Sequence, residues 1–129
     1  MANPNIVSVT SIYGGNASWN LSSTVTTTLL TVVADVLIKV NSITVANVDG
    51  TNAATFDLFI SGVGTTVTGV TGTTLATVIY LAKTVAVPPD EVYVIVDRPI
   101  YLMENDVLRG GTTGTSCDLF ISFEVINDA

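Results

Sequence analysis

Histidine is absent from this sequence of 129 residues. It is the commonest general base, the commonest zinc ligand and the usual partner of a serine or cysteine nucleophile. Its absence excludes Ser-His and Cys-His hydrolases and histidine-based zinc sites. We therefore expect no catalytic residues, no cofactor and no bound metal, and we do not predict an enzyme.

Cysteine and positive charge are also scarce. Cys117 is the only cysteine, so no disulfide forms within the chain, and the apolar run around it predicts a buried thiol. Four Lys and Arg residues stand singly against 11 Asp and Glu, giving a net charge of −7. Because phosphate binding needs clustered Lys and Arg, we expect no nucleic-acid partner. The acidic balance keeps an apolar protein soluble.

Carboxylates and neighbouring oxygens are the remaining candidates for chemistry. Two carboxylates suffice for a glycosidase, and calcium takes six to eight oxygen ligands. These residues nevertheless stand in apparent turns. The two oxygen-rich stretches, residues 49–52 and 104–106, match no defined calcium loop, so we predict that their side chains cap turns. The residues considered are Asp49, Thr51, Asn52, Asp90, Glu91, Asp97, Glu104, Asn105 and Asp106. Residues 110–114 lack the Lys-Ser/Thr ending of a phosphate loop and are predicted to be a plain loop.

Long apolar runs are missing as well. No run reaches the roughly 18 to 20 residues that a membrane helix needs, so no membrane partner is expected. Residues 1–5 lack a basic stretch followed by an apolar one, which predicts no secretory signal and synthesis in a cytoplasm.

Strand-forming residues are abundant. Hydrophobic residues make up 48% of the chain and charged residues 12%, and the β-branched Thr and Val dominate its middle. About eight or nine strand segments are separated by Gly, Pro and Asp turns, without helical periodicity. The length is that of one domain. We predict an all-β fold: residues 1–129 form a single-domain antiparallel β-sandwich, jelly-roll-like.

The turn signals divide the chain into segments. Asp49-Gly50 predicts a tight hairpin turn, after which residues 54–61 return antiparallel to residues 36–48. Residues 63–73 are expected to be a flexible loop or weak edge ribbon. A helix over residues 75–83 is the alternative to a strand there, but it would contain β-branched residues. The predicted strands cover residues 6–10, 24–33, 36–48, 54–61, 75–87, 92–96, 100–102, 107–109 and 117–126.

Two aromatic residues near the N-terminus are candidate interface residues. Tyr13 opens a predicted turn over residues 13–16, and Trp19 follows in a polar loop. Aromatic side chains in such loops anchor protein interfaces or stack on sugar rings, whereas Trp19 could equally cover an end of the sandwich. We expect residues 1–19 to form an N-terminal arm that reaches a neighbouring molecule.

Three stretches carry a resemblance to a known group of proteins: residues 7–14 (VSVTSIYG), 43–54 (ITVANVDGTNAA) and 100–109 (IYLMENDVLR). In this order and spacing the chain resembles small β-sandwich structural proteins of tailed phages of marine and freshwater bacteria, including cyanophages. The likeness covers most of the chain, and its motifs are turn-and-strand patterns. The sequence departs from it at residues 63–73, which are longer and richer in Gly and Thr.

The resemblance implies a virion component, most similar to a capsid cement or decoration protein. Such a protein would be made in the host cytoplasm, assemble as a homotrimer and bind the major capsid protein of the head. A mean hydropathy of +0.60 is high for a soluble monomer and agrees with surface buried between subunits. Two alternatives remain: a neck, tail or fibre component, and a sugar-binding or host-attachment module.

Overall fold

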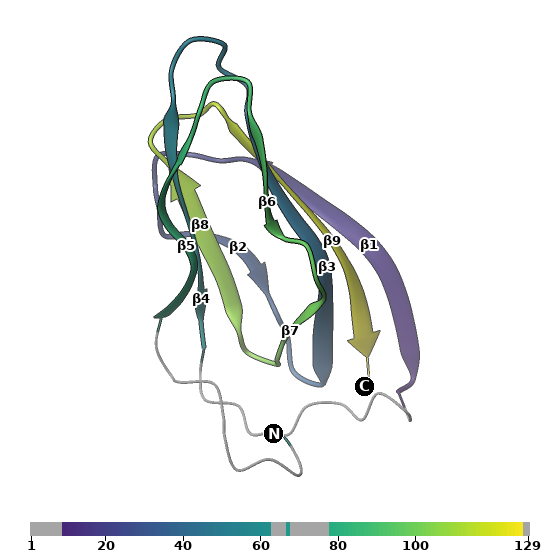
Figure 1. The fold of residues 1–129 in the computed structure, drawn as a ribbon. Helices are drawn as coiled ribbons and strands as arrows, with labels where there is room; N and C mark the ends of the chain where they lie inside the picture. Colours follow the sequence, from purple (N-terminus) through teal and green to yellow (C-terminus); the bar gives the residue numbers. More distant parts are fainter. Residues whose placement is uncertain (1–8, 63–66, 68–77, 128–129) are drawn as a thin grey trace.

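The computed structural model describes residues 9–62, 67 and 78–127, and these form strands and loops (Figure 1). The predicted all-β fold is confirmed. The strands of this part of the chain are β1 (Ser11–Asn20), β2 (Thr27–Thr31), β3 (Val36–Asn47), β4 (Ala54–Ser61), β5 (Val78–Val87), β6 (Val92–Val96), β7 (Ile100–Leu102), β8 (Val107–Thr112) and β9 (Cys117–Asn127).

The strands form two antiparallel sheets that face each other. One sheet has five strands in the order β1-β9-β3-β6, with β7 also paired to β3, and the other has four in the order β2-β8-β4-β5. Successive strands mostly alternate between the sheets, and β6 and β7 together occupy one strand position beside β3. This is the jelly-roll arrangement of a β-sandwich.

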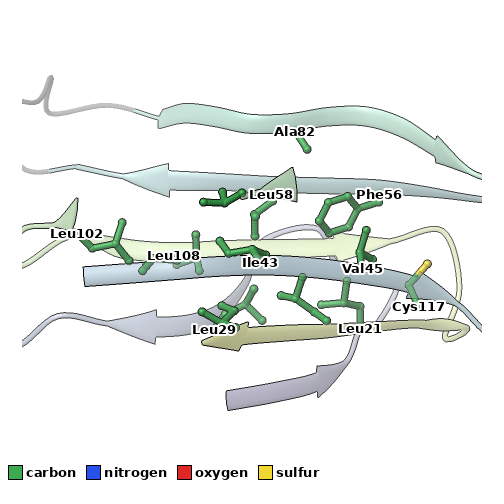
Figure 2. Close-up of a cluster of buried hydrophobic side chains, with 14 of the residues drawn as sticks. Leu21, Leu29, Ile43, Val45, Phe56, Leu58, Ala82, Leu102, Leu108 and Cys117 are labelled. Atoms are coloured by element: carbon green, nitrogen blue, oxygen red, sulfur yellow. The ribbon is translucent and has the colours of Figure 1, made fainter. Parts of the chain in front are cut away.

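Side chains from both sheets fill the space between them (Figure 2). Ile43 and Val45 of β3 face Phe56 and Leu58 of β4, and all four are fully buried. Cys117 is buried in the same core as a free thiol, as its apolar context predicts. Alternation of buried and exposed residues along each strand produces this single layer of apolar contacts.

The predicted hairpin between β3 and β4 is wrong. Although Asp49-Gly50 lies in the connecting turn, β3 pairs with β6, β7 and β9, whereas β4 pairs with β5 and β8. The connection therefore crosses from one sheet to the other. The chain bends at Gly50 and Thr51 without the positive φ of a tight hairpin turn, and local residue preferences do not determine which strand the chain pairs with next.

The buried side-chain amide of Asn47 holds this crossing in place. Its Nδ2 donates to the carbonyl oxygens of Asn52 at 2.9 Å and Val87 at 3.0 Å. Its Oδ1 accepts from the Asp49 amide at 3.1 Å and from the Ser116 hydroxyl at 2.9 Å. One side chain thus joins the end of β3, the crossing loop, the end of β5 and the loop before β9.

We expect Asn47→Ala to lower the free energy of unfolding by about 2–4 kcal/mol, because buried backbone groups lose their partners. Chemical denaturation of the purified protein measures this loss. Asn52→Ala is the matched control, since its exposed side chain makes one bond of 3.2 Å to Asp49 and its loss should cost under about 1 kcal/mol. Equal losses in the two variants would contradict the role assigned to Asn47.

The predicted turn at residues 13–16 and the loop around Trp19 are also wrong. Both segments belong to β1, which pairs with β9 residue by residue from Ser11 to Asn20. Gly15 lies opposite Phe123, and a Cβ atom at this position would meet the Phe123 ring at 3.5 Å, an ordinary van der Waals contact. Residues 11–19 are therefore part of a sheet and not of an extended arm. Residues 1–8 lie outside the described residues.

Residues 110–112, predicted as part of a loop, belong to β8. A Cβ atom on Gly111 would lie 2.5 Å from the carbonyl oxygen of Thr24, closer than real atoms approach. The glycine thus allows the chain before β2 to pack directly on β8. Most of the predicted loop at residues 63–73, together with residues 75–77, lies outside the described residues, and the described part of the 75–87 segment is strand β5.

Candidate interaction surface

The outer face of the five-stranded sheet is formed by the strand residues whose side chains point away from the core. Along β9, Leu119 and Ile121 are buried, whereas Asp118 and Phe120 are exposed. Along β6, Tyr93 and Ile95 pack against the core, whereas Val92 and Val94 are exposed. This alternation is the ordinary pattern of a sheet with one buried face.

Large apolar side chains stand exposed at one end of this face. Phe120 is 44% exposed, Val94 58% and Val92 60%. The register places Phe120 of β9 opposite Thr44 of β3, and Thr44 opposite Val94 of β6, so the three residues form one row across the sheet. Val92 lies two residues before Val94 on the same face. We call Val92, Val94 and Phe120 the outer apolar patch.

Charges on the outer face are engaged with neighbouring groups. Lys39 of β3 and Glu124 of β9 are register partners whose Nζ and Oε2 atoms lie 3.6 Å apart. The Asp118 carboxylate accepts a 2.9 Å hydrogen bond from the Asn20 side chain. A partner that covers this face therefore meets apolar surface and polar groups that already interact with one another.

The opposite end of the same face is apolar as well. Ile12 of β1 lies opposite Ile126 of β9, which in turn lies opposite Leu37 of β3. Leu37 and Ile126 are buried, whereas Ile12 is 56% exposed. Tyr101 of β7, 49% exposed, pairs with Lys39 between the two ends. Exposed apolar side chains thus stand at both ends of the outer face, with Tyr101 and the Lys39–Glu124 pair between them.

The outer face of the four-stranded sheet has a different character. Its residues include charged groups, and the Asp57 carboxylate accepts the Thr84 amide hydrogen at 2.9 Å. The rings of Phe59 and Tyr80 contact each other at 5.2 Å, and the Lys83 ammonium lies 4.9 Å from the centre of the Tyr80 ring. Val78, Ile79 and Tyr80 of β5 are 40% to 45% exposed, less than the 58% and 60% of Val94 and Val92, so we consider the five-stranded sheet the better docking surface.

The structure places the two candidate interface residues, Tyr13 and Trp19, on one strand and on one face. Counting by twos along β1, both lie on the side of the sheet that faces the core, where Trp19 is the register partner of buried Leu119. Trp19 is half-buried and packs against the core cluster, so it covers part of the core. Tyr13 lies near the other end of β1 and is 62% exposed.

The Asp49 carboxylate, considered for calcium, caps its own loop. Its Oδ1 accepts the amide hydrogens of Thr51 at 2.8 Å and Asn52 at 3.0 Å. These hydrogen bonds, with that from the Asn52 side chain, lower the pKa of Asp49 below its usual 3.8. Within residues 9–62, 67 and 78–127, no three or more Asp, Glu or Cys side chains gather as a metal site.

Two other candidate carboxylates, Glu104 and Asp106, are buried in the turn before β8. The Oε2 atom of Glu104 accepts the Asp35 amide hydrogen at 2.9 Å, and Oδ2 of Asp106 accepts that of Met103 at 2.9 Å. Burial raises the pKa of Asp106, an effect that the Met103 bond partly offsets. Glu104 thus ties the β7–β8 turn to the chain before β3, whereas the Asp106 carboxylate caps the turn itself.

The raised pKa of Asp106 has a defined effect on stability. The folded protein holds the Asp106 proton more tightly than the unfolded chain, so this group contributes stability at low pH that is lost as pH rises from about 3.8 through the folded pKa. Asp106→Asn removes this titration while keeping an oxygen that can accept from Met103. We expect the free energy of unfolding of the variant, minus that of the parent, to be more negative at low pH than at pH 7.

Denaturant unfolding of parent and variant at both pH values measures this difference. Asp97→Asn removes one negative charge from an exposed side chain and serves as the control for the loss of charge alone. An Asp106→Asn effect that is constant between the two pH values, or that varies in the opposite sense, would contradict the assignment.

No protein-family model and no curated protein matches the chain. Among solved structures, the chain is similar to one described under "Bacillus endospore appendages form a novel family of disulfide-linked pili". The two are 18% identical with a TM-score of 0.45, and the match covers 92% of this chain and 88% of the other. The described residues contain no helix long and apolar enough to cross a membrane.

Proposed function

We propose that this chain is a structural component of a phage virion, a capsid cement or decoration protein that binds the assembled head through the outer face of its five-stranded sheet. The supporting observation is the outer apolar patch, in which Val92, Val94 and Phe120 are 44% to 60% exposed. Exposed apolar groups gathered on one face of a soluble protein mark interaction sites.

The sheet suits this role because it presents the patch on a hydrogen-bonded framework. Val94, Thr44 and Phe120 come from three adjacent strands, so their spacing is set by the register of β6, β3 and β9. A shell protein that covers the row removes apolar surface from water, which favours binding by roughly 25 cal/mol per Å². The charged group in the same row as Val92 is the Asp118 carboxylate, which accepts a hydrogen bond from the Asn20 side chain.

Stabilisation of the head follows from mass action. A subunit that binds the assembled shell and not its separated components raises the free energy needed to rupture the shell. Many weak contacts that bridge neighbouring capsid proteins add up through multivalency. The proposed partner is thus the major capsid protein, and the proposed location is the virion.

The two alternative functions, a neck, tail or fibre component and a sugar-binding module, require different surfaces or partners. A neck, tail or fibre component would use the same surface and differ in copy number and partner. A sugar-binding module needs an open aromatic platform, and the half-buried Trp19 packs against the core cluster instead. The residues described thus favour a protein partner over a glycan.

The experiment is binding of the purified protein to particles that lack it, measured by co-sedimentation. Val94→Asp places a carboxylate in the middle of the outer apolar patch and should weaken binding at least about tenfold, or ~1.4 kcal/mol. Val33→Asp is the matched control, because Val33 is 61% exposed in the loop between β2 and β3, away from the sheet face. Binding of Val94→Asp at the level of Val33→Asp would contradict the proposed surface.

A further inference from the structure

The outer strands of the two sheets differ in how well their edges are protected against pairing with another chain. Natural sheets protect edges by short strands, bulges, charges or proline. Strand β2 has 5 residues and a register shift after Thr28. Beside β3, the edge is split between β6 and β7, with Pro99 in the break. Strand β5 has two register shifts against β4, carries Lys83 and contains Thr84 at a positive φ of 53°.

Strand β1 has none of these protections. It is 10 residues long, pairs with β9 without a register shift, and contains no charged residue and no proline. Most of its residues are exposed, and Figure 1 shows it at the margin of the five-stranded sheet with β9 as its neighbour. A long, uncharged edge with an unshifted register is a template for an added strand.

The hydrogen-bonding pattern identifies the backbone groups at this edge. The Leu21 amide donates to the Cys117 carbonyl oxygen at 2.8 Å, which places residue 21 in a hydrogen-bonded position opposite β9. In an antiparallel pair such positions recur at every second residue, so the odd-numbered residues of β1 bond to β9. The even-numbered residues direct their N–H and C=O groups outward; these are Ile12, Gly14, Asn16, Ser18 and Asn20, all exposed.

We propose that β1 pairs antiparallel with β1 of a second copy of this chain, about a twofold axis at Asn16. This register pairs every outward-facing residue: Asn16 with Asn16, Gly14 with Ser18 and Ile12 with Asn20 of the other copy. A register shifted by two residues would leave at least one outward-facing residue of each β1 strand unpaired. The two five-stranded sheets thereby become one continuous sheet.

The same register brings together the two aromatic residues that the sequence marked as interface candidates. The odd-numbered residues lie between these pairs, and among them Tyr13 of one copy lies opposite Trp19 of the other. The twofold axis produces this aromatic pair twice. Directly opposed residues of this kind have Cβ atoms roughly 4.5–5.5 Å apart, close enough for ring contact. Tyr13 is 62% exposed and Trp19 half-buried within one copy, so the pairing would cover surface on both.

A second copy is the partner that the edges favour, in a twofold pair that takes the place of the homotrimer implied by the resemblance. Pairing β1 with another described edge of the same protein would oppose its 10 residues to a strand that is short, split or bulged. Pairing with its own equivalent matches two edges of equal length without opposing any charges. The twofold axis is perpendicular to the sheet, so both outer apolar patches face the same side and can engage one partner surface together.

Proline scanning of the edge tests the pairing in the full-length protein. Asn16→Pro removes an outward-facing N–H and leaves the bonds to β9 intact, so the protomer should keep its circular dichroism spectrum. Sedimentation equilibrium at about 100 μM should show a dimer for the parent and a monomer for Asn16→Pro. Asn16→Ala keeps the N–H and should remain dimeric.

Cysteine crosslinking tests the register and does not depend on particles, so its outcome is separate from that of the proposed function. Asn16→Cys places two thiols directly opposite each other across the axis and should form a disulfide-linked dimer under mild oxidation. Ser18→Cys lies opposite Gly14 and should crosslink far less. A parent that is monomeric or trimeric, a dimer that persists in Asn16→Pro, or preferential crosslinking through Ser18→Cys would overturn the proposal.

Discussion

The crossing of the chain between two sheets depends on one buried amide. Asn47 ends β3, and its side chain satisfies carbonyl and amide groups from the crossing loop, the end of β5 and the loop before β9. Buried backbone groups without partners are costly, so this network fixes where β4 begins relative to β3. The positions of the core strands, and with them the outer face of the five-stranded sheet, follow from that crossing.

The fold class followed from the sequence because strand composition and turn residues are local signals. Strands β3, β4, β6, β7 and β9 begin and end within a residue of the predicted bounds. Sheet membership is not local: Asp49 and Gly50 have the chemistry of a hairpin turn, yet β3 and β4 pair with different strands. The Gly-rich start of β1 was misassigned for the same reason, because pairing with β9 outweighs the turn preference of Gly14 and Gly15.

The candidate surface was only partly visible in the sequence. Tyr13 and Trp19 were identified as aromatic residues near the N-terminus, but their common strand became clear only with the pairing to β9. The outer apolar patch was missed, although residues 92–96 carry a signal for it. Five consecutive apolar residues in an antiparallel strand must place some of them on the outer face, where Val92 and Val94 are exposed.

The copy number of this protein in purified virus particles is the most direct test of a cement or decoration role. Quantitative mass spectrometry gives its molar ratio to the major capsid protein. The account predicts comparable amounts of the two proteins, as expected for a subunit spread over the shell. A ratio of a few copies per particle would place the protein in the neck or tail, and its absence from particles would contradict a virion role altogether.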